Sequence, residues 1–174
     1  MGEMSEFTEG PETPEGKALF EELLWVHGMV RRDLDTVRRL ADECQAGRPA
    51  EELADEIREL ETNGPLWRLK VNCLRYCRFV HSHHGAEDAL LFPRLRAANP
   101  KIGPVVDRLE SEHRDVSELL DEVEESARAL TEVEGDASRR RLADALSGLA
   151  DDLLAHLSYE EDSVGPTLSR MRGL

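Results

Sequence analysis

The stretch "HSHHGAEDALLFPRL" at residues 81–95 places three histidines and two acids directly before an apolar run. A shorter stretch, "HLSYEEDSVGP" at residues 156–166, repeats part of this arrangement. Both interrupt segments in which apolar residues recur every three or four positions, as they do on the buried face of a helix. Imidazoles and carboxylates therefore stand where a helix should bury leucines, and both the fold and the function depend on the reason.

The same helical periodicity extends outward from these stretches over most of the chain. The apolar positions run from Phe20 to Cys44, from Leu66 to Leu91, from Val106 to Leu130 and from Leu142 to Val164. Clusters of glycine, proline and asparagine separate the segments, and no stretch has the alternation of a strand. The sequence therefore predicts an all-α, antiparallel up-down four-helix bundle. Its second helix should run to about Ala98, with a kink near Pro93, and residues 50–62 should form a short extra helix or a longer connection.

Composition limits the class of protein. A length of 174 residues suits one domain, and 22 Lys and Arg against 37 Asp and Glu give a net charge of −15. That excess argues against nucleic acid or a membrane surface as a partner. Residues 1–16 are acidic, contain proline and glycine, and are expected to form a disordered tail before a bundle over 17–174. The sequence lacks a signal peptide and an apolar run long enough for a membrane span, so we expect a cytoplasmic protein.

Polar residues interrupt the apolar stripe of every helix. Each helix supplies one histidine, and the second and fourth helices add a glutamate four residues later, which lies on the same helix face. The interrupting residues are His27, His83 or His84, Glu87, His113, His156 and Glu160. His83 is preferred over His84 because of its spacing to Glu87, and His81 is expected to lie off this face.

These residues should lie at one level of the bundle. His27 and His113 each follow the start of their helix by about 11 residues, or ~16 Å at 1.5 Å per residue. Glu87 and His83 precede the end of theirs by about 11 and 15 residues, or ~16 and ~22 Å, and His156 and Glu160 are placed similarly. In an up-down bundle the starts of odd helices meet the ends of even helices. All six groups therefore fall in one layer.

A buried layer of four histidines and two glutamates requires a positive partner. An unpaired buried carboxylate costs several kcal/mol, and two such groups would repel each other. No lysine or arginine lies on the stripes at that level. A metal is the economical answer, and the donors are too many for one tetrahedral zinc. They suit two ions bridged by both carboxylates, and histidine with carboxylate is the donor set of non-haem iron.

Residues 83–93, "HHGAEDALLFP", resemble the H-x-x-x-E-E-x-x-L-F-P signature of hemerythrin-like (HHE cation-binding) domains. "HLSYEE" at 156–161 resembles the second copy, and His27 and His113 complete the order of histidines. The resemblance covers about residues 17–170. It implies two non-haem iron ions with an oxo or hydroxo bridge, and a small ligand such as dioxygen, peroxide or nitric oxide. His27, His83, His113 and His156 would be terminal ligands, with Glu87 and Glu160 as bridges.

Three departures from the family pattern bear on function. Ser117 stands where oxygen-carrying hemerythrins have a second histidine on helix three, which removes one nitrogen donor. Val164-Gly165-Pro166 replaces L-F-P, and the missing aromatic should leave room near the site. His84 is an extra histidine that can replace His83 or add a fifth nitrogen.

Three functions are compatible with this pattern. The first is binding or sensing of dioxygen or a related small molecule, with a separate protein partner if the chain is a sensor. The second is a di-iron enzyme acting on peroxide or nitric oxide. The third is a metal-free helical interaction module with a polar core layer. Asp88 and Glu161, which follow the two bridging candidates, should either be solvated or hydrogen-bond the ligand imidazoles.

Overall fold

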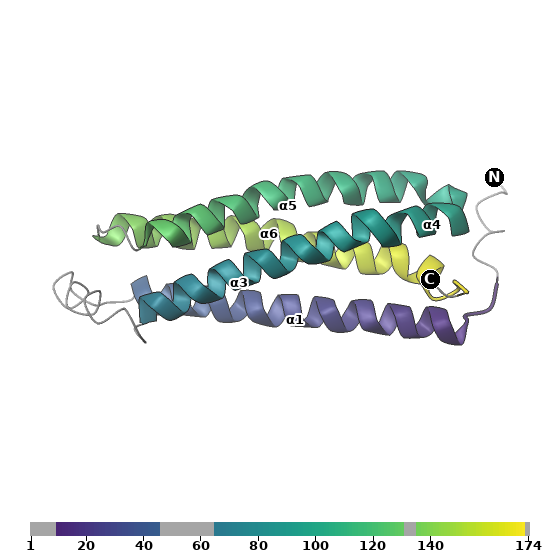
Figure 1. Ribbon diagram of the computed structural model, residues 1–174, viewed down its shortest axis with the longest axis horizontal. Helices are drawn as coiled ribbons and strands as arrows, with labels where there is room; N and C mark the ends of the chain where they lie inside the picture. Colours follow the sequence, from purple (N-terminus) through teal and green to yellow (C-terminus); the bar gives the residue numbers. More distant parts are fainter. Residues whose placement is uncertain (1–9, 46–64, 131–134, 173–174) are drawn as a thin grey trace.

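The computed structural model describes residues 10–45, 65–130 and 135–172. Its long helices are α1 (Pro14–Gln45), α3 (Pro65–Ala86), α5 (Gly103–Ala129) and α6 (Gly135–Leu168). Successive helices run in opposite directions, and the first and last described residues lie at the same end (Figure 1). α1 packs against α3 and α6, and α5 packs against the same two helices, so the four close a ring around one interior. The expected antiparallel up-down four-helix bundle is confirmed.

The described ends of the chain are fastened to each other. Thr13 caps α1, because its hydroxyl accepts a hydrogen bond from the Gly16 amide at 2.9 Å. The Thr13 amide donates to the Ser169 carbonyl at 3.0 Å, and Arg170 Nε donates to the Gly10 carbonyl at 2.8 Å. Residues 10–16, expected to be tail, are therefore ordered, and α1 begins at Pro14. Residues 1–9 and the expected extra helix at 50–62 lie outside the described residues.

The second expected helix is divided at Glu87, after the histidines of its polar stretch. A π-helical turn, η1 (Glu87–Leu91), follows α3 and leads into α4 (Phe92–Ala98). The Phe92 amide donates to the Glu87 carbonyl, five residues back. Pro93 has no amide hydrogen with which to continue the regular ladder, so the expected irregularity takes this form and begins before the proline. After η2 (Pro100–Ile102), α5 starts directly at Gly103.

Two apolar clusters fill the interior on either side of the polar residues. On α1, Val30 and Leu34 belong to the larger cluster, whereas Leu23 belongs to the smaller one. On α6, Leu153 and Leu157 lie in the larger cluster and Val164 in the smaller. The histidines and glutamates thus occupy a polar layer between two apolar cores. None of the described helices is both long and apolar enough to cross a membrane.

Candidate metal centre

All seven candidate metal ligands from the sequence pattern lie in one buried cluster. His27 comes from α1, His83 and His84 from the last turn of α3, and Glu87 from η1. α5 supplies His113, and α6 supplies His156 and Glu160. All but His83 are buried, and His83 retains only slight exposure. His81 lies outside this cluster, where its Nε2 is 3.3 Å from Asp121 Oδ1. This agrees with the expectation that His81 lies off the shared helix face.

The donor atoms form two groups that share one carboxylate. The first comprises His84, Glu87, His113 and His156, and the second comprises His27, His83 and Glu87. Within each group the donor atoms lie within 4.8 Å of one another, which is close enough to hold a metal ion. Glu87 belongs to both groups because its Oε1 lies 2.7 Å from His83 Nε2 while its Oε2 lies 3.2 Å from His113 Nε2.

The first group is nitrogen-rich. His113 Nε2 and His156 Nε2 lie 3.0 Å apart, which is about the separation of two nitrogens bound at right angles to one ion. His84 stacks on His113 with ring centroids 3.9 Å apart and an angle of 10° between the planes. Phe92, the aromatic of the expected L-F-P segment, stacks on the His113 ring at 5.3 Å.

The second carboxylate also spans the two groups. Glu160 Oε2 lies 3.5 Å from His27 Nε2 and 3.5 Å from His156 Nε2, so it contacts one histidine of each group. Glu160 is 0% exposed and Glu87 is 4% exposed. None of their four oxygens makes a hydrogen bond of normal geometry in the structure. Two desolvated carboxylates without hydrogen bonds are costly in a protein interior, so a cation between them fits the donor set.

Burial governs the charges in the layer. It lowers the pKa of His84 to about 2 and of His156 to about 3, and the neighbouring His113 contributes in the same direction. Both imidazoles are therefore neutral at physiological pH, which is the form that binds metals. Burial, followed by the charge of Glu87, raises the pKa of Glu160 well above its usual value. Burial alone would also raise the pKa of Glu87, but the imidazoles of His113, His27 and His83 outweigh it and lower that pKa.

Carboxylates behind the cluster orient two of the imidazoles. His27 Nδ1 lies 2.9 Å from Glu161 Oε1, and His113 Nδ1 lies 2.8 Å from Asp88 Oδ1. Each bond places a proton on Nδ1 and leaves Nε2 free to face the cluster. Of the two alternatives expected for Asp88 and Glu161, solvation or hydrogen bonds to the imidazoles, the structure shows the hydrogen bonds, and Asp88 is also 43% exposed.

Sequence reasoning missed one member of this outer layer. Arg31 donates to both oxygens of Glu161, at 2.7 and 3.1 Å. Burial would raise the pKa of Glu161, but Arg31 and His27 outweigh it and lower that pKa. Arg31 follows His27 by four residues, so its position on the same side of α1 was visible in the spacing.

The structure also bears on two of the departures from the family pattern. Of the two alternatives for His84, it agrees with an additional nitrogen and not with replacement of His83, because His83 and His84 each join a different group. At Gly165 the missing aromatic leaves no room. A Cβ at that position would lie 2.7 Å from Phe20 Cζ, so the Phe20 ring of α1 already occupies the space.

These features define a class: an all-α bundle whose buried histidines and glutamates can hold metal ions. Residues 18–168 match the family model described as the hemerythrin HHE cation binding domain. The chain belongs to this hemerythrin family, as the resemblance in its motifs indicated. Among curated proteins and among solved structures, no match was found.

Proposed function

We propose that the protein is a non-haem di-iron protein that binds or senses dioxygen or a related small molecule. One ion would be held by His84, His113 and His156, and the other by His27 and His83. Glu87 and Glu160 would bridge the two ions, with an oxo or hydroxo group between them. The observation that carries this proposal is the pair of buried carboxylates, each in contact with histidines of both groups and neither hydrogen-bonded.

The two proposed ions differ in their protein donors. His84 supplies the third nitrogen of the first group, which compensates for Ser117 on α5. The second group has only two nitrogens, His27 and His83, and an ion there has more room for a small molecule. Histidine and carboxylate donors with vacant positions favour non-haem iron chemistry, in which iron supplies electrons to a bound oxidant.

The protein's own groups would prepare the site. Glu161 and Asp88 hold the imidazole protons at Nδ1 of His27 and His113, and the two apolar cores exclude bulk water from the layer. A water-poor setting strengthens the attraction between the carboxylates and the cations. If the chain is a sensor, a separate protein partner would receive the signal.

Anaerobic reconstitution with ferrous iron, followed by optical spectra on adding dioxygen, peroxide or nitric oxide, tests this function. We expect two iron ions per chain and a new absorption band that disappears when dioxygen is removed. Irreversible oxidation with catalytic loss of peroxide or nitric oxide would favour the di-iron enzyme instead. Spectra unchanged by all three molecules would contradict both.

A further inference from the structure

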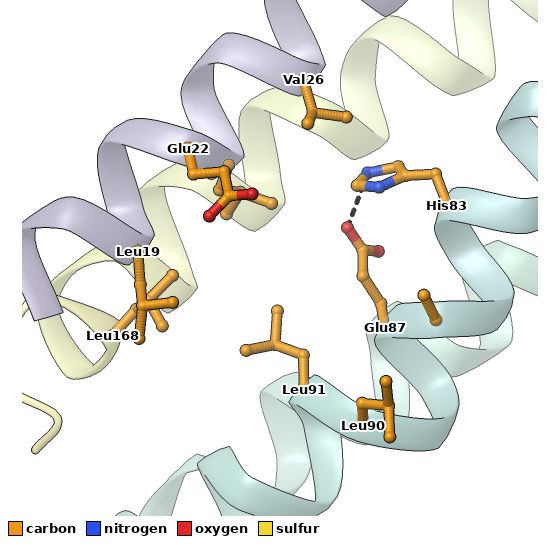
Figure 2. Close-up of a pocket in the computed structure, with 10 residues that line it drawn as sticks. Leu19, Glu22, Val26, His83, Glu87, Leu90, Leu91 and Leu168 are labelled. Atoms are coloured by element: carbon orange, nitrogen blue, oxygen red, sulfur yellow. Dashed lines mark ion pairs between the residues drawn. The ribbon is translucent and has the colours of Figure 1, made fainter. Parts of the chain in front are cut away.

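A pocket beside the proposed His27 and His83 ion is larger than a diatomic ligand requires. It lies between α1, the junction of α3 with η1, and the last turn of α6 (Figure 2). Its walls are aliphatic: Leu19, Leu23, Val26, Leu91 and Leu168. His83 and Glu87 form one end, where Figure 2 shows the imidazole and the carboxylate facing each other.

Size indicates what this pocket can hold. Its volume is about 230 Å³. A cavity of about 150 Å³ lined by aliphatic and aromatic side chains binds benzene, whereas a water molecule has a share of only about 30 Å³. The pocket can therefore accept an organic molecule of about six to ten non-hydrogen atoms, and a diatomic gas would leave most of it empty.

The charge and polarity of the lining further restrict the class of ligand that this pocket could bind. Glu87 is 4% exposed and its Oε1 pairs with His83 Nε2 at 2.7 Å, so the inner end of the pocket is a polar imidazole–carboxylate pair beside aliphatic walls. A second carboxylate, that of the exposed Glu22, points from α1 toward the middle of the pocket (Figure 2). Two carboxylates disfavour an anion by like-charge repulsion. The aliphatic walls favour a ligand with an apolar body, and a single hydroxyl or hydroperoxyl group on that ligand would match the polar end of the pocket.

We propose that this pocket binds a neutral organic molecule with an aryl or branched-alkyl body and one terminal hydroxyl or hydroperoxyl group. The body lies among the leucines and Val26, and the oxygen points to His83 and Glu87. This inference rests on the proposed function in one respect: if the iron ion at His27 and His83 is present, the ligand's oxygen would face it. Binding of the apolar body depends on the walls alone.

The experiment uses 4-fluorophenol as the probe and the full chain, both metal-free and iron-loaded. Fluorine NMR titration measures its affinity, and nuclear Overhauser contacts between probe and leucine methyl groups locate it. Val26→Phe fills the pocket. Leu24→Phe is the matched control, because Leu24 lies on the same helix, is 39% exposed and does not line the pocket. Ala86→Leu is a second filling variant at an exposed position of the lining, which guards against a folding defect in the first.

We expect saturable binding by the wild type, at least tenfold weaker binding by each filling variant, and a change of less than twofold in the control. Absence of saturable binding, or wild-type affinity in both filling variants, would overturn the pocket proposal. Iron content and the dioxygen spectrum are measured on the same samples. A chain that takes up no iron but binds the probe in a Val26-dependent way would refute the proposed function and support the pocket.

Discussion

Replacing Glu161 by glutamine should weaken metal binding more than the corresponding change at Asp88. Glu161 accepts the proton of His27 Nδ1 at 2.9 Å and is held by Arg31 at 2.7 and 3.1 Å. The glutamine side chain has only one acceptor oxygen, so either His27 Nδ1 loses its hydrogen-bond acceptor or Arg31 loses one of its two hydrogen bonds. Because the Glu161 side chain is only 17% exposed, water replaces the lost bond poorly. Asp88 is 43% exposed, and water can reach His113 Nδ1 in its place.

Loss of a partner behind a metal-binding imidazole typically costs 10- to 100-fold in affinity, or about 1.4–2.8 kcal/mol. We expect Glu161→Gln to lie near the upper end, at about 100-fold, and Asp88→Asn near the lower end, at about 10-fold. Anaerobic competition between the protein and a chromophoric chelator for ferrous iron measures both. Asp162→Asn removes the same charge from an exposed neighbour and is the control. An effect of less than twofold at Glu161, or a larger effect at Asp88, would refute the reasoning.

Three further predictions concern stability, measured by thermal or urea unfolding. Gly16→Ala should lower the free energy of unfolding by about 1–3 kcal/mol, because its Cβ would lie 2.6 Å from the Leu168 carbonyl oxygen. Gly148→Ala is the control: a Cβ there meets nothing within 4 Å, so the free energy of unfolding should rise by about 0.5–1 kcal/mol. Equal effects of the two substitutions would contradict this prediction. Glu160 has a raised pKa, so the metal-free fold takes up a proton and its stability falls as pH rises above the ordinary 4.5. Metal-free Glu160→Gln has no titrating group at this position, so its stability relative to the wild type should increase as pH rises. Parallel stability profiles of the two proteins against pH would contradict the raised pKa of Glu160. Chelation should destabilise the wild type by about 2.7 kcal/mol relative to metal at 100 times its Kd, and an unchanged melting temperature would argue against a buried ion.

The fold could be predicted from the sequence because helical periodicity and glycine-proline breaks are local signals. The common level of the polar residues followed from the same periodicity once the helices were taken to alternate. The start of α1 was not predictable from composition, since it depends on Thr13 bonding to the far end of the chain. The π-helical turn at Glu87 was also not predicted, because Pro93 indicates that the helix is irregular but does not determine whether it kinks or forms a π-helical turn.

The site was predictable in its members but not in their grouping. Spacing left two alternatives for His84, replacement of His83 or an additional nitrogen, since each histidine alone is a suitable distance from Glu87. In the structure the cluster is wide enough for both, and they join different groups because adjacent helical residues point about 100° apart. The pocket depends on packing among α1, the α3–η1 junction and α6, and the Phe20 ring over Gly165 depends on packing between α1 and α6. No local pattern reports either.

The central claim is that the polar layer holds two cations, which Glu87 and Glu160 bridge. An anomalous-difference map from crystals of iron-reconstituted protein, collected at the iron absorption edge, tests it most directly. We expect two peaks, one next to His84, His113 and His156 and the other next to His27 and His83, with both carboxylates between them. A single peak, or a layer filled only by water, would contradict the account, and the latter result would favour a metal-free interaction module.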